Sequence, residues 1–255
     1  MPVEIVTIPC LSDNYAFIGH NASTGETFLV DAPEAKPILA ALEARSWTLH
    51  YILLTHHHGD HIDGVAEILS QYNAKVVGAG ADAHRLPRLD EEVHEGDTLH
   101  ICDEPVHVLD VSGHTVGHIA FHMPESGAVF TADSLMALGC GRVFEGTMDQ
   151  MWDSLSKLAA LPADTIVCSG HEYTTANAAF AQTIEPDNPD LISRIADIKA
   201  ARERNEPTVP SKLSLELATN PFLRANEASI RRNLGLQDAQ PSEVFAEIRR
   251  RKDSF

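Results

Sequence analysis

The sequence predicts an α/β protein followed by a helical region. Up to about residue 170, short β-branched runs alternate with amphipathic helices and with turns rich in Gly, Asp and Asn. After His171 there is no strand pattern, and helical stretches are punctuated by proline. Because 255 residues suit one large domain or a domain with an appendage, we expect two parts, residues 1–171 and 172–255.

The predicted strands are short apolar runs bounded by turn residues: Glu4–Ile8, Ala16–Gly19, Thr27–Val30, Tyr51–Leu54, Lys75–Val77, Val106–Val111, Ile119–His122, Ala128–Phe130 and Thr165–Cys168. Three helices between them carry apolar residues at three- and four-residue spacing: Lys36–Arg45, Val65–Tyr72 and Asp149–Leu161. Each of these helices is expected to pack on a sheet.

Four more helices are expected in the second part: Thr174–Gln182, Pro189–Asn205, Ser211–Thr219 and Ser242–Lys252. The pairs Asn188-Pro189 and Pro241-Ser242 favour helix starts, because proline is tolerated in the first turn, where its missing N–H is not needed. The pair Asn220-Pro221 favours a helix stop.

The net charge and the cysteines exclude several classes of protein. With 19 Lys and Arg against 37 Asp and Glu, the formal charge of −18 would repel a phosphate backbone, so we expect no nucleic acid partner. No apolar stretch approaches the roughly 20 residues that cross a bilayer, and the start of the chain lacks a signal-peptide pattern. Four scattered cysteines without a CxxC pair fit a reducing compartment. We therefore expect a cytoplasmic protein that does not associate with membranes.

The strongest functional signal is the run from Thr55 to His61, Thr-His-His-His-Gly-Asp-His, directly after an apolar strand. In extended chain, residues i and i+2 point the same way, so His56 and His58 can bind one metal ion, and His57 should point away. Asp60 and His61 can then turn toward a second ion. A solvated or tag-like histidine run is disfavoured, since a tag would be terminal and uninterrupted.

Three further ligand candidates follow predicted strands. His114 comes after the strand that ends at Val111, Asp133 follows the run through Phe130, and His171 follows Cys168. Because α/β sheets present their chemistry at strand ends, we expect these side chains at the same site. The remaining histidines are expected to be exposed or hydrogen-bonded without a functional role: His20, His50, His84, His94, His100, His107, His118 and His122.

The ligand order His-x-His-x-Asp-His, then His, Asp and His, resembles the pattern of the metallo-β-lactamase superfamily. The resemblance implies a metallo-β-lactamase-like αββα sandwich with a C-terminal helical domain. It implies that one metal is bound by His56, His58 and His114, that a second is bound by Asp60, His61 and His171, and that Asp133 bridges both. Four protein ligands per metal leave room for a shared water and a substrate oxygen, as a catalytic site requires.

The ligand types suggest the metal and the reaction. Imidazole and carboxylate without thiolate suit zinc, iron or manganese, and we expect two divalent ions per chain, with zinc favoured. Water held between two dications loses a proton near neutral pH, so the predicted reaction is hydrolysis by a metal-bound hydroxide. Asp60 and Asp133 are the predicted catalytic carboxylates.

Within that superfamily the chain is similar to the glyoxalase II (hydroxyacylglutathione hydrolase) family over essentially its whole length. The similarity is carried by residues 11–15 (LSDNY), 139–142 (GCGR), 170–173 (GHEY), 220–224 (NPFLR) and 250–255 (RRKDSF). It implies a thioester hydrolase that converts S-D-lactoylglutathione and water to glutathione and D-lactate, the second step of methylglyoxal detoxification. It further implies a monomer with a metal-binding catalytic domain at 1–171 and a helical glutathione-substrate-binding domain at 172–255.

The basic C-terminal end has two possible roles. Arg249 and Lys252 are spaced i, i+3 on one helix face, where they could bind a carboxylate together or simply complement the helix dipole. The family resemblance favours the first role, and it implies glutathione contacts from Arg142, Phe144, Tyr173, Arg249 and Lys252. Phe144 stands where the family often has Tyr, so one hydroxyl contact to glutathione is expected to be missing.

Two other functions are compatible with parts of the pattern. A persulfide dioxygenase uses the same scaffold and glutathione, but one iron needs neither the second ligand set nor the helical tail. A non-catalytic metal-binding module would have a closed site of four ligands without an open position.

Overall fold

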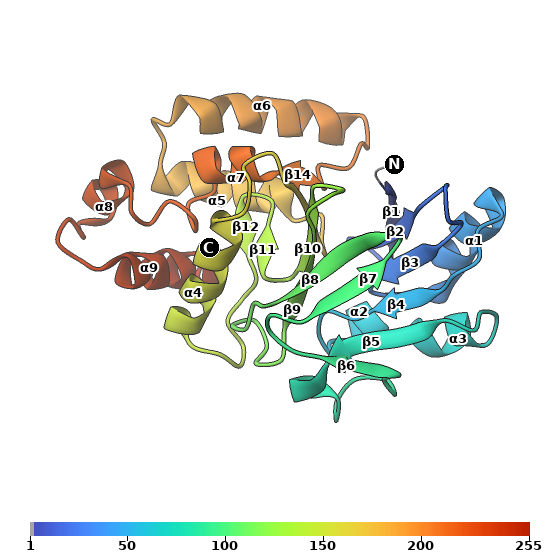
Figure 1. The fold of residues 1–255 in the computed structure, drawn as a ribbon. Helices are drawn as coiled ribbons and strands as arrows, with labels where there is room; N and C mark the ends of the chain where they lie inside the picture. Colours follow the sequence, from blue (N-terminus) through green and yellow to red (C-terminus); the bar gives the residue numbers. More distant parts are fainter. Residues whose placement is uncertain (1–2) are drawn as a thin grey trace. The chain divides into compact units, whose positions relative to one another are not determined.

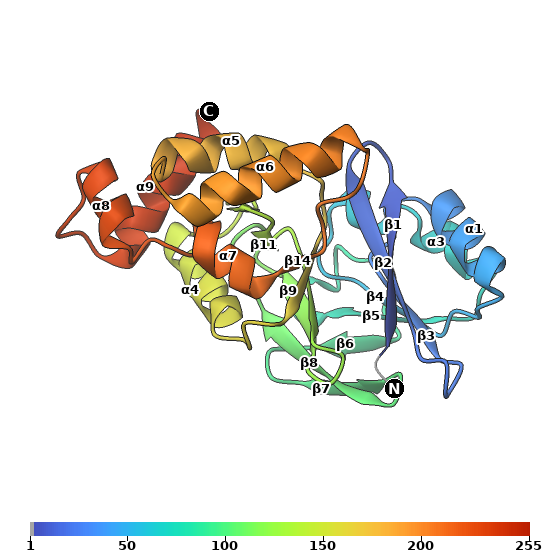
Figure 2. The same ribbon diagram turned by 90° about the horizontal axis from the view of Figure 1, so that it is seen from above.

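The computed structural model describes residues 3–255, which fall into two compact units. Unit 1 contains the described residues up to Val111 together with Val116–Ala132, and unit 2 contains Ser112–Thr115 and Asp133–Phe255. Figures 1 and 2 show the chain in two views, coloured from blue at the N-terminus to red at the C-terminus. The functional division expected at residues 171 and 172 is a different one, and it stays a prediction.

Unit 1 contains a sheet with the strand order β1 to β6. Its strands are β1 (Glu4–Cys10), β2 (Asn14–His20), β3 (Thr27–Val30), β4 (Tyr51–Leu53), β5 (Lys75–Ala79) and β6 (Glu91–Val93). The first three strands are antiparallel and β3 to β6 are parallel, so the parallel strands need crossover connections. Helices α1 (Ala35–Arg45) and α3 (Val65–Leu69) lie in two of these connections and bury Ile38, Leu42 and Ile68 in one apolar core with the sheet.

A second sheet in unit 1 is antiparallel and packs on the first. The strands that unit 1 contributes to it are β7 (Thr98–Ile101), β8 (Glu104–Asp110), β9 (Ile119–Met123) and β10 (Ala128–Ala132). Phe130 of β10 lies 5.8 Å from the ring of Phe17 and 5.7 Å from that of Phe28, which belong to β2 and β3. These aromatic contacts join the inner faces of the two sheets into one core.

Unit 2 is mainly helical. Its helices are α4 (Met148–Ala159), α5 (Thr174–Ile184), α6 (Pro189–Glu203), α7 (Leu213–Thr219), α8 (Ala228–Leu234) and α9 (Pro241–Asp253). Short strands complete it: the hairpin β11 (Leu135–Met136) and β12 (Gly139–Cys140), and the antiparallel pair β13 (Ile166–Ser169) and β14 (Ser211–Lys212). Buried Phe222 lies 6.0 Å from the rings of both Phe180 and Phe245, so it joins α5 and α9 in one core.

The predicted strands and helices are present, with their ends moved by a few residues. Asn188 caps α6 through hydrogen bonds to its side chain from the N–H groups of Asp190 and Leu191, α9 begins at Pro241, and α7 ends one residue before Asn220, as expected. The expectation that no strand follows His171 is wrong, because β14 pairs with β13 and displaces the start of the expected helix to Leu213. Two residues are too few to give a strand periodicity in the sequence. Also missed were β6, β7, β11, β12, α8 and the short helices α2 (Gly59–Ile62) and η1 (Gly80–Asp82).

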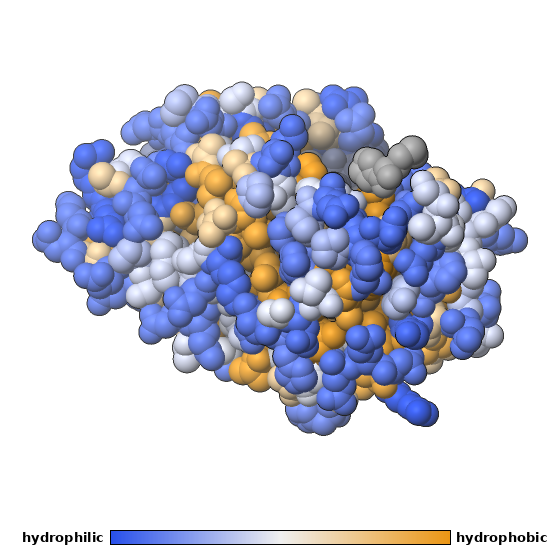
Figure 3. Space-filling model, viewed as in Figure 1, coloured by the Kyte–Doolittle hydropathy of each residue, from blue (hydrophilic) through white to orange (hydrophobic). Residues whose placement is uncertain are grey.

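The face seen in Figure 3 is largely hydrophilic, with smaller areas of hydrophobic residues between the charged ones. Among residues 3–255, none of the helices combines the length and apolar character that crossing a membrane requires.

Candidate metal centre

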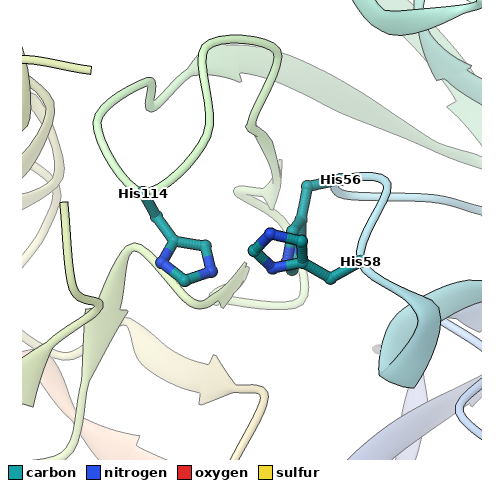
Figure 4. A group of neighbouring side chains, drawn as sticks. All are labelled: His56, His58 and His114. Carbon is teal, nitrogen blue, oxygen red and sulfur yellow. The ribbon is translucent and has the colours of Figure 1, made fainter. Parts of the chain in front are cut away.

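Unit 1 presents the first group of predicted ligands on the loop after β4. The Nε2 atom of His56 lies 3.1 Å from Nδ1 of His58, and the two rings are close to perpendicular. Figure 4 shows these two side chains beside each other on that loop. His114, also labelled there, comes from the loop after β8 and belongs to unit 2. His56 is fully buried and His58 is partly exposed, as expected for ligands at the edge of a sheet.

One buried carboxylate that the sequence analysis did not single out holds the rings of two predicted ligands. Asp31, directly after β3, accepts hydrogen bonds from the N–H and the hydroxyl of Thr55 at 2.9 and 2.8 Å. Because that hydroxyl donates to Asp31, its oxygen can accept from Nδ1 of His56, 3.1 Å away. Asp31 Oδ2 also lies 2.7 Å from Nδ1 of His61, and this contact directs the other ring nitrogen of His61 away from Asp31. Such oxygen partners fix the tautomer and orientation of metal-binding histidines.

Asp60 is held by the LSDNY segment near the start of the chain. The side-chain amide of Asn14 donates to both the backbone oxygen and Oδ2 of Asp60, each at 3.0 Å. The same Oδ2 lies 3.9 Å from Nε2 of His61, so the two predicted ligands face each other. Asn14 therefore orients Asp60, a role that the sequence motif alone did not reveal.

Of the histidines not predicted to bind metal, His57 has the orientation expected from the sequence. The ring of His57 turns to Asp82, with Nδ1 2.9 Å from Oδ2, and so points away from His56. His118 is buried, stacks on the ring of His56 at 4.5 Å and lies 3.1 Å from the Ile119 carbonyl oxygen. His84, His94 and His100 are exposed, while His20, His50, His107 and His122 lie among their neighbours in the sheets.

Unit 2 presents the second group, His114, Asp133 and His171. Oδ2 of Asp133 lies 3.5 Å from Nε2 of His114 and 3.3 Å from Nε2 of His171, and all three side chains are buried. One carboxylate oxygen thus lies close to two imidazole nitrogens. This is the arrangement expected of a carboxylate that shares metal ions with two histidines.

The GCGR segment places this second group. Nδ1 of His114 lies 2.7 Å from the carbonyl oxygen of Arg142, which leaves Nε2 directed toward Asp133. Gly141 packs so closely that an added Cβ would lie 1.9 Å from the Asp133 carbonyl oxygen, so only glycine fits there. The segment therefore holds both ligands through its backbone.

The NPFLR segment contacts the hairpin whose second strand, β12, begins the GCGR segment. The amide of Asn220 donates to the carbonyl oxygens of Met136 and Gly139 at 3.1 and 3.0 Å, and fully buried Glu216 accepts from the N–H of Leu138 at 2.8 Å. Leu138 has a positive φ of 54°, which these two side chains help to maintain. The motif that distinguishes the family in sequence thus supports the segment between Asp133 and Arg142.

The donor atoms of both groups fit divalent metal ions. Two ligands bonded tetrahedrally to one zinc ion lie about 3.4 Å apart, since each bond is about 2.1 Å long. The ring-nitrogen and carboxylate distances within the two groups, 3.1, 3.3 and 3.5 Å, match this spacing. In His56, His61 and His114, the ring nitrogen Nδ1 lies within hydrogen-bond distance of a protein oxygen, which leaves Nε2 for a metal ion. The chemistry and the spacing of the donor atoms are those of metal ligands.

The predicted substrate contacts that lie on the surface of unit 2 are Arg142, Phe144 and Tyr173. The guanidinium of Arg142 lies 5.9 Å from the ring of Phe144, which is 61% exposed. Tyr173 is 41% exposed and stacks on the ring of His171 at 4.5 Å. Phe144 lies 5.3 Å from the ring of His114, so both aromatic side chains adjoin predicted metal ligands.

The two basic residues of the tail differ from each other. Arg249 is buried and donates to the Cys140 carbonyl oxygen and to Asp253. Lys252 is partly exposed, donates to the Ala176 carbonyl oxygen at 3.2 Å and lies 5.3 Å from the rings of Phe180 and Phe255. Burial, and the neighbouring Arg249, lower the pKa of the Lys252 ammonium.

Comparisons with known proteins agree with this geometry. Residues 11–171 match the metallo-beta-lactamase superfamily, and residues 172–255 match the hydroxyacylglutathione hydrolase C-terminus. Relatives named hydroxyacylglutathione hydrolase, from Ruegeria pomeroyi and Cereibacter sphaeroides, are 64% and 63% identical to this chain over 255 residues, the full length of both partners in each comparison. A metallo-beta-lactamase structure from Staphylococcus aureus superposes with a TM-score of 0.68 at 19% identity, covering 97% of this chain and 70% of that one. That structural likeness shows a shared fold.

The fold expected from the ligand pattern is therefore confirmed: a metallo-β-lactamase fold of mixed sheets and helices, followed by a helical C-terminal domain. The superfamily, together with the histidine and aspartate groups of the two units, implies that the chain binds divalent metal ions. Full-length identity above 60% to the named relatives narrows the assignment further, and the chain belongs to the hydroxyacylglutathione hydrolase family.

Proposed function

We propose that this chain hydrolyses S-D-lactoylglutathione to glutathione and D-lactate. The observation that carries the proposal is the spacing of the predicted ligand atoms. In unit 1, ring nitrogens of His56 and His58 lie 3.1 Å apart, and in unit 2 a carboxylate oxygen of Asp133 lies 3.3–3.5 Å from two imidazole nitrogens. Relatives that bear the name hydroxyacylglutathione hydrolase match the whole chain, which supports the choice of a glutathione thioester as substrate.

In this proposal two divalent ions, with zinc favoured, are bound by all seven predicted ligands. His56, His58 and His114 would hold the first ion, Asp60, His61 and His171 would hold the second, and Asp133 would be a ligand of both. When bound, such ions lower the pKa of water and polarise a carbonyl oxygen, which is the chemistry that thioester hydrolysis needs. The support is the family resemblance together with the fit of each group to metal-ligand spacing.

The other steps of thioester hydrolysis need few groups from the protein. A thiolate leaving group has a pKa of about 8.5, so it departs from the tetrahedral carbon without a strong general acid. Asp60, which Asn14 holds through Oδ2, orients the attacking water in this mechanism. Buried Asp31 keeps the rings of His56 and His61 in place throughout the reaction.

Unit 2 supplies the proposed glutathione contacts. The proposed cations for a carboxylate of glutathione are Arg142, Arg249 and Lys252. The exposed rings of Phe144 and Tyr173 provide apolar surface beside His114 and His171. The proposal assigns all seven metal ligands to a catalytic domain at residues 1–171, and it assigns a helical glutathione-substrate-binding domain to residues 172–255. It also includes a monomer located in the cytoplasm, without nucleic acid or membrane partners. The acidic charge supports the absence of a nucleic acid partner, and four buried cysteines that form no disulfide bond support a reducing compartment.

The test is loss of thioester absorbance from S-D-lactoylglutathione, with purified protein whose metal content is measured in the same preparation. We expect rapid hydrolysis with two metal ions per chain. Oxygen uptake on glutathione persulfide, with one iron per chain and no hydrolysis, would replace the proposal with a dioxygenase. Fully metallated protein that turns over neither substrate would indicate a metal-binding module.

A further inference from the structure

A fully buried carboxylate outside the proposed ligand set lies beside the loop that carries His56 and His58. Asp82 is the last residue of the short helix η1. Its Oδ1 accepts a hydrogen bond from Nε of Arg85 at 2.5 Å, and its Oδ2 lies 2.9 Å from Nδ1 of His57. A carboxylate only accepts hydrogen bonds, so the ring nitrogen of His57 is the donor. Because a buried carboxylate is costly unless it is paired, these two donors stabilise Asp82 in this position.

The contact between Asp82 and His57 bears on the direction of two predicted ligands. His57 stands between His56 and His58, and in extended chain successive side chains point to opposite sides. The backbone at His58 is extended, with φ −62° and ψ 141°. A ring of His57 that is held on one side therefore places its two neighbours on the other side. There their ring nitrogens lie 3.1 Å apart, and Figure 4 shows the two rings beside each other.

Asp82 also packs against the segment of unit 1 that leads into β9. A Cβ added at Gly117 would lie 2.5 Å from Cβ and 2.6 Å from Cγ of Asp82, so a side chain at this position would displace the carboxylate. The next residue, His118, stacks on the ring of His56, with centroids 4.5 Å apart and planes inclined by 12°. The two segments that meet at Asp82 therefore meet again at a predicted ligand.

We propose that Asp82 is a positioning residue for the ligand pair His56 and His58, and that it acts through the ring of His57. The guanidinium of Arg85 balances the charge of Asp82, so the effect on a metal ion comes from the orientation of the loop rather than from the field of the carboxylate. This inference rests on the ligands assigned in the proposed function, and it does not depend on the identity of the substrate.

Two substitutions of similar size at position 57 test the role of the hydrogen bond. The side-chain nitrogen of Asn lies at about the place of Nδ1 in histidine and can donate to Asp82, whereas Leu cannot. We expect His57→Leu to lower the affinity for Zn²⁺ about 10-fold to 100-fold, the usual effect of losing a partner outside the ligand set. His57→Asn should retain most of the affinity. The measurement is titration of the metal-free protein with Zn²⁺ in competition with a chelator.

A spectrum of the protein loaded with Co²⁺ gives a second reading on the same two variants, because the visible absorption of this ion depends on the geometry of its ligands. The spectrum should change in His57→Leu and stay close to that of the unsubstituted chain in His57→Asn. Equal loss of affinity in both variants, or unchanged affinity and spectrum in His57→Leu, would overturn the proposal.

A double-mutant cycle tests whether Asp82 acts through His57. Asn at position 82 has one accepting oxygen for two donors, so Asp82→Asn should weaken Zn²⁺ binding in the unsubstituted chain. In a His57→Leu background the same substitution should cause little further loss, because the side chain that Asp82 positions has already lost its donor. An equal loss in both backgrounds would show that Asp82 acts by another route and would overturn the proposal.

The matched control is Asp90→Asn. Asp90 accepts a hydrogen bond from the N–H of Val76 at 2.9 Å, so its substitution also weakens a carboxylate contact within unit 1, at the strand β5. Affinity for Zn²⁺ should be unchanged in this variant, and a loss equal to that in Asp82→Asn would contradict the specific role of Asp82. All of these measurements are made without substrate. Failure of the proposed function would therefore show separately, as absence of hydrolysis by the unsubstituted, fully metallated chain.

Discussion

Oδ2 of Asp31 lies 2.7 Å from Nδ1 of His61, and the same oxygen accepts the hydroxyl of Thr55, which contacts His56. One buried carboxylate therefore sets the ring orientation of two proposed ligands that belong to different metal ions. Because an imidazole binds a metal through one nitrogen, the partner of the other nitrogen decides which way the ring faces. Asp31 influences both metal positions without being one of the seven proposed ligands.

The substitution Asp31→Asn should lower the affinity for divalent metal about 10-fold to 100-fold, because an amide accepts the hydrogen bonds of Thr55 and His61 less strongly than a carboxylate. The measurement is metal content after dialysis against graded chelator. Asp103→Asn is the matched control: Asp103 is exposed and has a positive φ of 65°, against 56° at Asp31, so both substitutions face the same backbone conformation. Equal metal retention in the two variants would contradict the role of Asp31.

The substitution Asp133→Ala should abolish hydrolysis and reduce the metal content together, because Asp133 is the proposed bridge and lies near both His114 and His171. Both quantities are measured on one preparation. Asp153→Ala, an exposed position on α4, should change neither. Full metal content in the Asp133 variant, with activity retained, would refute the bridging assignment.

The substitution Phe144→Tyr should lower the KM for S-D-lactoylglutathione modestly. The ring is 61% exposed, so a hydroxyl can be added without a clash, and it would supply the glutathione contact that the family often makes with Tyr. A neutral hydrogen bond is worth about 1 kcal/mol, so the expected change is about fivefold at most. Steady-state kinetics measure it, and Phe255→Tyr, at another exposed ring, is the control. A KM that does not fall would remove Phe144 from the glutathione contacts.

The substitution Lys252→Ala should raise KM and leave kcat nearly unchanged, because Lys252 contributes binding that the substrate and the transition state share. Burial lowers the pKa of Lys252, so its charge is lost at lower pH than that of an exposed lysine. In the unsubstituted chain, KM should therefore begin to rise at a lower pH than it would if Lys252 had the pKa of an exposed lysine. In the Lys252→Ala variant this rise of KM with pH should be weaker. Loss of kcat with unchanged KM would place Lys252 elsewhere in the mechanism.

The ion pair between Glu185 and Arg224 predicts a dependence of stability on pH. Burial alone would raise the pKa of Glu185, but hydrogen bonds from Arg224, Ser229 and Asn188 outweigh it and lower that pKa. A carboxyl whose folded pKa is depressed stabilises the fold above its unfolded pKa, and that stability is lost as pH falls through the folded pKa. The Tm should therefore fall between about pH 5 and pH 3.

The matched variant for this pair is Glu185→Gln, which should have a lower Tm at neutral pH because Arg224 is left without its partner. The Tm difference between variant and unsubstituted chain should narrow as the pH falls. Glu125→Gln, at an exposed position in a turn far along the chain from this pair, is the control. A difference that stays constant from neutral to acidic pH would show that the charge of Glu185 does not stabilise the fold.

The sequence predicted the metal ligands because each follows a buried strand, and the end of a strand is a position that local hydrophobicity reveals. The same rule applies to Asp31, which follows β3 directly, but a single acidic residue in a turn carries no spacing pattern that distinguishes it. In the sequence, Asn14 stood out only as part of the LSDNY motif. Its two hydrogen bonds to Asp60 join residues 46 positions apart, a relationship that only the folded chain creates.

For the two basic residues of the tail, the sequence predicts the shared helix face but not the contacts of either side chain. Helical spacing determines by itself that Arg249 and Lys252 lie on one face of a helix, because 3.6 residues make a turn. Which groups that face meets depends on contacts over long separations, and there Arg249 is buried against Cys140, 109 residues away, while Lys252 reaches Ala176, 76 residues away. The sequence by itself predicted the ligand set, identified the family and predicted the order of the longer elements. Only the tertiary structure decided which cations serve the interior and which remain exposed, because burial and partners are properties of the packed chain.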